Sequence, residues 1–222
     1  MTDVTVEEVR AELAAIQDPR MREVNARHGD DHGANLAALR RLAKRIGTRH
    51  DLAGELWRSG DSDARLVAIL VCRPRELTAD ELDAMLRESR TPKVRDWLVS
   101  YVVKKGPHAE ELRGRWLPDP DPDVAAAGWA LTADSVTRHP DRVDLDDLLG
   151  TIETEMLEAP APAQWEMNTC LAMIGIHHAS HRDRAIGIGE RLGVLKDYPT
   201  PPNCTSPFAP AWITEMVRRR EG

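Results

Sequence analysis

Arginine and lysine side chains gather in two stretches of this 222-residue chain. Residues 36–58 contain six basic and two acidic residues, and residues 90–116 contain seven basic and three acidic residues. Guanidinium and ammonium groups bind phosphate, and contacts to backbone phosphates supply much of a protein's affinity for nucleic acid. The candidate phosphate-binding residues are Arg41, Lys44, Arg45, Lys93, Lys104 and Lys105. The alternative is that each stretch is only a solvated helix face whose long side chains cover apolar surface.

The charge of the whole chain opposes a nucleic-acid partner, because the formal net charge is -7. Its distribution is uneven, however: residues 119–158 contain eleven acidic residues and only two basic ones. A chain of this kind can be acidic overall and still carry a basic binding surface. The acidic block would also suit a basic protein partner.

Two other kinds of site find little support in the sequence. His177 and His181 are one helical turn apart, but the spacing supplies no third metal ligand. The three cysteines are odd in number and widely separated, which is typical of neither a disulfide framework nor a metal site. We therefore expect no metal ion and no cofactor.

The composition predicts an all-α fold. Aromatic residues make up 4% of the chain, and runs of alternating apolar and polar residues are hard to find. Thr5 and Glu8, like Thr78 and Glu81, have the spacing of a capping box, which marks a helix start. The expected helices, twelve to thirteen in number, are residues 5–16, 19–28, 34–46, 50–59, 62–72, 79–89, 92–105, 108–116, 122–138, 145–158, 162–178, 181–192 and 210–220.

The rhythm of these helices predicts a repeat protein. Loops of two to five residues force successive helices to be antiparallel, and the more apolar member of each pair recurs near residues 62, 92, 122 and 162. We expect a C-shaped solenoid of HEAT-like helical pairs with a concave binding face, forming a single domain over residues 1–222. A compact irregular bundle is the alternative.

No apolar run is long enough to cross a membrane, since the longest covers residues 66–72. The N-terminal segment has acidic residues where a secretory signal would be basic. We expect a cytoplasmic monomer that does not associate with membranes.

Residues 36–74 resemble the DNA alkylation repair family, the AlkD-like glycosylases. The resemblance is carried by the sequence LAALRRLAKRI, then HDLAGELWRSG, and then Asp63-Ala64-Arg65, where the family usually has Glu-Ala-Arg. It implies HEAT-like helical pairs that cradle double-stranded DNA. It also implies a monofunctional glycosylase chemistry that releases N3- or N7-alkylated purines.

In active members of this family, a Trp precedes the key Asp by four residues on the helix equivalent to 92–105. The candidate catalytic carboxylate here is Asp96, but Pro92 stands four residues before it, and Trp97 is its neighbour. Adjacent helical residues point about 100° apart, so Asp96 and Trp97 cannot reproduce the family's arrangement. Residues 124–128 and 171–172 are likewise small or apolar where active members have a phosphate-binding Arg and a second groove Trp. Trp129 or Trp165 could take over a DNA-facing position.

Three hypotheses follow. The first is a DNA-binding HEAT-like repeat protein with weak or no glycosylase activity. The second is an active N-alkylpurine DNA glycosylase. The third is a helical scaffold that binds another protein.

Overall fold

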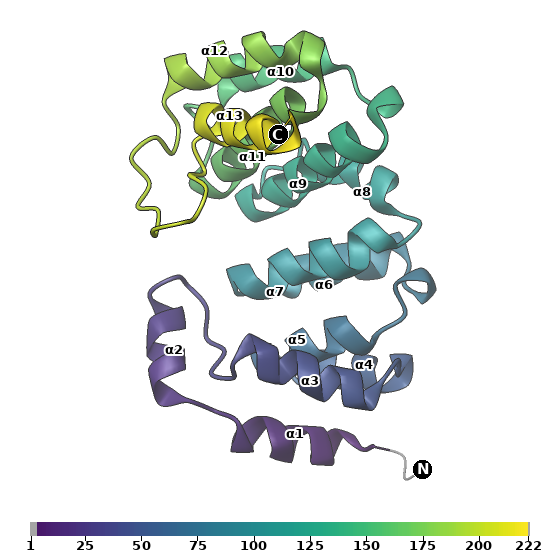
Figure 1. The fold of residues 1–222 in the computed structure, drawn as a ribbon. Coiled ribbons are helices and arrows are strands. Elements are labelled where there is room, and N and C mark those ends of the chain that lie inside the picture. The colour runs from purple at the N-terminus through teal and green to yellow at the C-terminus, as the bar shows by residue number, and fades with distance from the viewer. Residues whose placement is uncertain (1–3, 222) are drawn as a thin grey trace. The chain divides into compact units, whose positions relative to one another are not determined.

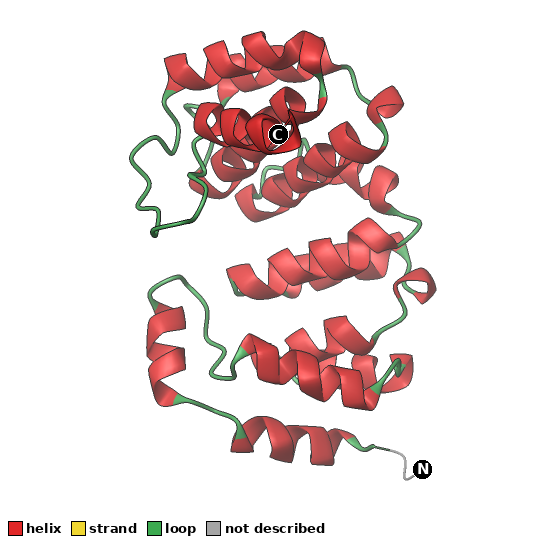
Figure 2. Ribbon diagram, viewed as in Figure 1, coloured by secondary structure: helices red, strands yellow, loops and turns green. Residues whose placement is uncertain are grey.

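The computed structural model describes residues 4–221, and in that range it has thirteen α-helices and no β-strand (Figures 1 and 2). The expected all-α class and number of helices are confirmed. The chain divides into two compact units, residues 1–109 and 110–222. One domain over residues 1–222 was expected from the sequence, and that expectation stays a prediction.

Unit 1 holds seven α-helices and three short helical turns. They are α1 (Val6–Ala15), α2 (Pro19–Ala26), α3 (Leu36–Ile46), α4 (His50–Arg58), α5 (Ser62–Val71), η1 (Pro74–Glu76), α6 (Ala79–Glu88), α7 (Pro92–Trp97), η2 (Leu98–Val102) and η3 (Val103–Lys105). Helix α5 lies at the centre of this unit, in contact with α1, α3, α4 and α7. Nine of its ten residues are buried, as its continuous apolar sequence requires.

Unit 2 begins within α8. Its elements are α8 (Ala109–Trp116), α9 (Pro122–Arg138), η4 (Pro140–Arg142), α10 (Leu145–Glu155), α11 (Ala161–His177), η5 (Ala179–His181), α12 (Arg182–Leu192) and α13 (Ala209–Glu221). Helix α11 is its central element and packs on α9, α10, α12 and α13. Nine of its seventeen residues are buried, as its mostly apolar sequence requires.

Small residues let the helices of unit 2 approach closely. A Cβ atom at Gly128 of α9 would lie 2.5 Å from the backbone nitrogen of Leu117, and one at Gly175 of α11 would lie 2.4 Å from Ile213 Cδ1. The backbone at Leu117 cannot move aside, so the first contact requires glycine, whereas at Gly175 the side chain of Ile213 would have to shift.

Local capping explains why the helix boundaries could be predicted. Both capping boxes form: the hydroxyl oxygens of Thr5 and Thr78 accept hydrogen bonds from the backbone N–H groups of Glu8 and Glu81. Asp18 caps the helix that begins at the following proline. Most expected ends agree with the structure to within three residues.

The continuous α-helix expected over residues 92–105 is wrong. The α-helical hydrogen bonding ends at Trp97, continues as a π-helical turn, η2, and finishes as a 3₁₀ turn, η3. Six side chains of residues 92–105 are buried, at residues 94, 97, 98, 99, 102 and 103, which is more than one side of a straight α-helix presents. The wider π turn changes the direction in which later side chains point, and such turns often occur at functional sites.

Candidate nucleic-acid interface

Four side chains of unit 1 form a cluster where α3 meets η2 and η3. The guanidinium carbon of Arg40 lies 4.7 Å from the ring centroid of Trp97, and Arg40 Nη2 donates a hydrogen bond to Tyr101 Oη at 3.3 Å. The rings of Trp97 and Tyr101 meet edge to face at 5.3 Å. Lys105 Nζ lies 5.0 Å from the centroid of the Tyr101 ring. Two cations are thus held at one tyrosine by aromatic contacts rather than by carboxylates.

A buried carboxylate fixes the segment that precedes α3. Asp63 of α5 is 1% exposed. It accepts hydrogen bonds from the backbone N–H groups of Gly33 (3.1 Å) and Ala34 (3.0 Å) and from Gln17 Nε2 (2.9 Å). Asn35 then caps α3, because its side chain accepts a hydrogen bond from the N–H of Ala37. These bonds set where the basic face of α3 begins.

The start of α7 is held from the same segment. Thr91 occupies the N-cap position but makes no side-chain capping bond. Instead, Asp30 accepts a hydrogen bond from the backbone N–H of Lys93 at 2.8 Å. The loop before α3 therefore connects α3 to the helix that carries Trp97.

The predicted phosphate-binding residues fall into two groups. Arg41 and Lys44 on α3 and Lys104 and Lys105 on η3 have no ion-pair partner among residues 4–221. By contrast, Arg45 pairs with Glu12 of α1, and Lys93 Nζ lies 3.8 Å from Asp96 Oδ2. The first group offers its full charge to a ligand, whereas the cations of the second group are partly neutralised.

A hollow of about 270 Å³ lies beside the α3 cations. Arg40 and Lys44, one helical turn apart, line it together with Gly47 and Thr48. Gly47 ends α3 with a φ angle of 74°, in the region that favours glycine. Arg40 and Lys44 are both exposed.

Asp96, the candidate catalytic carboxylate, lies on the exposed side of α7. Its side chain is 60% exposed, and it accepts a long hydrogen bond of 3.5 Å from Ser100 Oγ. Trp97, in contrast, is 3% exposed. The residue four positions after Trp97 is Tyr101, so no carboxylate stands one turn beyond this tryptophan.

Trp129 is buried in the core of unit 2, with 6% of its surface exposed. We leave it out of the proposed interface because a base could not stack on its ring without opening that core. Trp57 and Trp97 are buried as well.

Sequence reasoning missed Arg40 and Tyr101. Arg40 belongs to the basic stretch of residues 36–58, and Tyr101 follows Trp97 at the spacing that places two side chains on one helical face. The basic stretch and the helical spacing can both be read from the sequence. The contact between them could not be predicted, because it joins elements about sixty residues apart in the chain.

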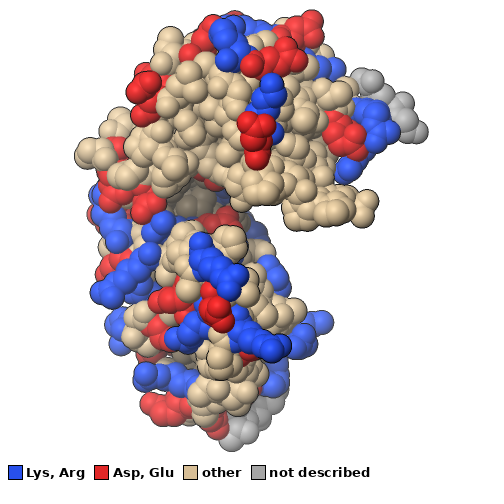
Figure 3. All heavy atoms as spheres, turned by 90° about the vertical axis from the view of Figure 1, so that its left-hand side faces the viewer, with Lys and Arg blue, Asp and Glu red and all other residues tan. Residues whose placement is uncertain are grey.

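The two units differ in charge. Residues 1–109 contain 19 Lys and Arg against 18 Asp and Glu, whereas residues 110–222 contain 11 against 19. In Figure 3, basic side chains (blue) are spread over the visible face of unit 1, interspersed with acidic ones, and the visible face of unit 2 is largely uncharged (tan). Unit 1 is therefore close to balanced in charge, and unit 2 carries the excess of acidic residues.

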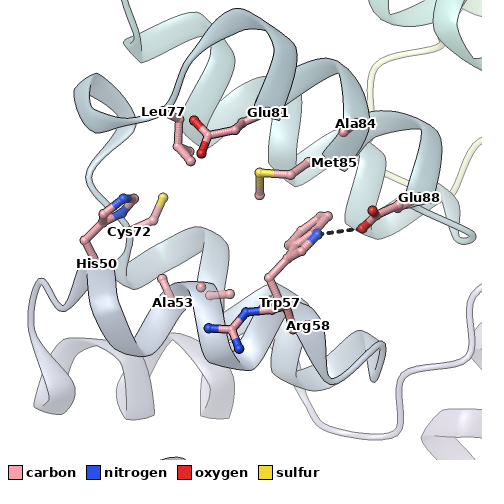
Figure 4. Close-up of a pocket in the computed structure, with 12 residues that line it drawn as sticks. His50, Ala53, Trp57, Arg58, Cys72, Leu77, Glu81, Ala84, Met85 and Glu88 are labelled. Carbon is pink, nitrogen blue, oxygen red and sulfur yellow. Dashed lines mark hydrogen bonds between the residues drawn. The ribbon is translucent and has the colours of Figure 1, made fainter.

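The remaining residues of the family-like motif build a scaffold on α4, α5 and α6. Arg65 is nine-tenths buried, and its guanidinium lies 4.7 Å from the ring centroid of Trp57 and donates to the carbonyl oxygen of Glu88 at 2.8 Å. Trp57 Nε1 donates to Glu88 Oε2 at 3.1 Å (Figure 4). The polar groups of Trp57 and Arg65 thus find their hydrogen-bond partner in Glu88, which indicates a structural role for this motif.

An apolar pocket of about 270 Å³ opens between α4 and α6 beside this scaffold (Figure 4). Cys72 lines it, and burial raises the pKa of its thiol to about 11. A thiol of such high pKa stays protonated near neutral pH, so the pocket holds no activated nucleophile.

The part of the chain that the structure describes contains neither a metal site nor a membrane-spanning helix. No three His, Cys, Asp or Glu side chains are grouped there as a metal site would require. No helix within residues 4–221 is long and apolar enough to span a membrane.

Comparison with known proteins gives a consistent result. An uncharacterized protein of Listeria innocua serovar 6a, Lin0241, is 21% identical over 227 residues, which cover 98% of this chain and 99% of the relative. The uncharacterized protein Lmo0209 of Listeria monocytogenes serovar 1/2a is 20% identical over 225 residues, with the same shares covered.

A solved structure also matches, with a TM-score of 0.81, 19% identity, and coverage of 98% of this chain and 95% of the other. That structure represents a new family of proteins related to the HEAT-like repeat DNA glycosylases, with affinity for branched DNA structures. This match confirms the HEAT-like helical fold expected from the sequence. The model of the family described as DNA alkylation repair enzyme matches residues 9–213, and the chain therefore belongs to the DNA alkylation repair enzyme family.

Proposed function

We propose that this protein binds double-stranded DNA through the basic surface of unit 1, and that it has weak or no glycosylase activity. The observation that carries the proposal is a set of five cations on α3 and η3 that have no carboxylate partner among residues 4–221. These residues are Arg40, Arg41, Lys44, Lys104 and Lys105. Aromatic contacts preorganise two of them, which lowers the entropy lost on binding a phosphate.

The affinity of the matched solved protein for branched DNA supports including junctions among the ligands. Contacts to the phosphate backbone do not depend on base sequence. We therefore expect binding to duplexes of any sequence, and to four-way junctions at least as tightly, because a junction presents more than one duplex arm.

Weak base release follows from the position of Asp96. A carboxylate that stabilises a developing sugar cation acts best in a site that excludes water. The side chain of Asp96 is 60% exposed, and Lys93 lies close enough to offset its charge. Incubation with N-methylated DNA and quantification of freed 3-methyladenine and 7-methylguanine tests this part. Release well above that of an Asp96→Asn variant would show an active glycosylase.

Fluorescence anisotropy with a labelled duplex over a salt series tests DNA binding. The variant Arg41→Glu/Lys44→Glu removes two phosphate contacts, so its slope of log affinity against log salt should fall by about 2 units. Arg58→Glu/Arg75→Glu makes the same charge change at exposed residues of α4 and η1 and should bind nearly as the wild type does. Equal affinity of the wild type and the α3 variant would remove the proposal.

A further inference from the structure

Exposed apolar side chains concentrate in unit 2. Among the described residues, four large apolar side chains are exposed, namely Val24, Leu157, Trp165 and Tyr198, and three of them belong to unit 2. Trp165 of α11 and Tyr198 of the loop after α12 meet edge to face, with ring centroids 5.1 Å apart and planes at 72°. Although they pack on each other, they are still 37% and 46% exposed.

Leu157 is tied to the same part of the surface. Gln164 Nε2 donates hydrogen bonds to the carbonyl oxygens of Met156 (2.9 Å) and Leu157 (3.4 Å). The turn that carries Leu157 is thereby fastened to the first turns of α11, where Trp165 follows Gln164. We call Leu157, Trp165 and Tyr198 the aromatic patch.

Each member of the aromatic patch has an acidic neighbour in the chain. Glu158 follows Leu157, Glu166 follows Trp165, and Asp197 precedes Tyr198. Glu158 and Asp197 are exposed and form no ion pair within residues 4–221. Lys196 directly precedes Asp197, and the Lys or Arg nearest to Glu158 in the chain is Arg142, sixteen residues earlier. Unit 2 as a whole contains 11 Lys and Arg against 19 Asp and Glu.

Exposed apolar side chains with acidic neighbours indicate which kind of partner fits the aromatic patch. Phosphates of nucleic acids or anionic lipids would be repelled by the carboxylates around the patch. Arg and Lys side chains, by contrast, are attracted by those carboxylates and bind the faces of indole and phenol rings. An exposed patch of large apolar side chains also favours a partner that contributes apolar contacts.

We infer that the aromatic patch is a docking surface for a basic protein segment in which Arg or Lys side chains are interspersed with apolar ones. The cations of the segment stack on Trp165 and Tyr198 and pair with Glu158 and Asp197, and its apolar side chains cover Leu157. This surface is separate from the basic residues of unit 1, and it does not depend on DNA binding.

Peptide titrations against the full-length protein test the inference. The probe is a fluorescein-labelled peptide of arginine and leucine residues separated by Gly-Ser spacers. One comparison peptide has every leucine replaced by serine, and another has every arginine replaced by glutamate. We expect the arginine–leucine peptide to bind about tenfold or more tightly than either comparison peptide, and to bind more weakly as salt is raised.

Two variants and a control locate the binding. Trp165→Ala/Tyr198→Ala should weaken binding of the arginine–leucine peptide by about tenfold or more. Glu158→Gln/Asp197→Asn leaves the apolar packing intact. It should weaken binding of the arginine–leucine peptide severalfold and reduce the salt dependence of that binding. Val24→Ser replaces the exposed apolar residue of unit 1 and should leave binding unchanged. Circular dichroism establishes that each variant is folded.

Three outcomes would overturn the inference. The first is equal binding of all three peptides, or no binding of any. The second is peptide binding that neither patch variant alters. The third is loss of duplex DNA binding in the patch variants without loss of peptide binding, which would assign the patch to DNA. DNA binding by unit 1 is measured with the α3 variant, so the two proposals can fail separately.

Discussion

The guanidinium of Arg40 lies over the indole ring of Trp97, with 4.7 Å between its central carbon and the ring centroid. This contact joins the basic helix α3 to α7, the helix that carries Asp96. It holds a cation at the surface of unit 1, and that cation has no carboxylate partner among residues 4–221. A cation held in this way suits the proposed binding of phosphate.

Replacing Arg40 should weaken DNA binding. Loss of one charged phosphate contact costs about 1–2 kcal/mol, so we expect Arg40→Ala to bind a duplex roughly 5- to 30-fold more weakly. Arg40→Lys keeps the charge but loses the planar group that stacks on Trp97. Its affinity for the duplex should therefore lie between those of the wild type and Arg40→Ala. Anisotropy at constant salt provides the measurement, with Arg58→Ala as the matched control. Wild-type affinity in Arg40→Ala would exclude a role for the cluster.

Asp63 should be more important for stability than its acidic neighbour Asp61. Asp63→Ala leaves two buried backbone N–H groups and the Gln17 amide without their acceptor, which should lower the free energy of unfolding by about 2–4 kcal/mol. Asp61→Ala removes only the N-cap of α5 and should cost about 1 kcal/mol. Urea denaturation compares the two. Equal losses would show that Asp63 does not hold the segment before α3.

The two glycines Gly128 and Gly150 should respond to alanine in opposite directions. A Cβ atom at Gly128 would collide with the backbone at Leu117, so Gly128→Ala should destabilise the protein by about 1–3 kcal/mol. At Gly150 nothing lies within 4 Å of the added carbon, and Gly150→Ala in α10 should stabilise by up to about 1 kcal/mol. Thermal denaturation of both variants checks the close approach of α8 and α9. Stabilisation by Gly128→Ala would contradict it.

Acidification should destabilise unit 2 through His177. Burial, together with the nearby positive charge of Arg220, lowers the pKa of His177 below its usual value of 6.5. The unfolded chain therefore takes up this proton at a higher pH than the folded chain does. The stability from this histidine is complete above about pH 6.5 and is lost as the pH falls toward the folded pKa. His177→Gln should show a smaller drop in Tm between pH 7.5 and 5.5 than the wild type, and an equal drop would count against this role.

The helices could be predicted from the sequence because their signals are local. Capping boxes, Asp–Pro starts and stop glycines act within one turn, and they place most ends within three residues. The π turn at Leu98–Val102 could not be predicted, since it depends on how many side chains the surrounding helices bury. Trp129 illustrates the same limit, because the core that hides it includes residues of α10, α11, α12 and α13, which follow it in the chain.

For the candidate site, the sequence supplied the charges but not their pairing. Arg41 and Arg45 look equivalent on one helix, yet Arg45 pairs with Glu12, which lies thirty-three residues earlier in the chain. Which cations remain available for a ligand is decided by tertiary contacts.

Lysine footprinting tests the central claim most directly, because the chain has only five lysines: Lys44, Lys93, Lys104, Lys105 and Lys196. The protein is acetylated briefly with and without a DNA duplex, and each site is quantified by mass spectrometry. DNA binding by unit 1 predicts strong protection of Lys44, Lys104 and Lys105, while Lys196 of unit 2 reacts equally in both samples. Protection of Lys196 alone, or equal labelling of all five lysines under conditions where DNA is bound, would contradict the account.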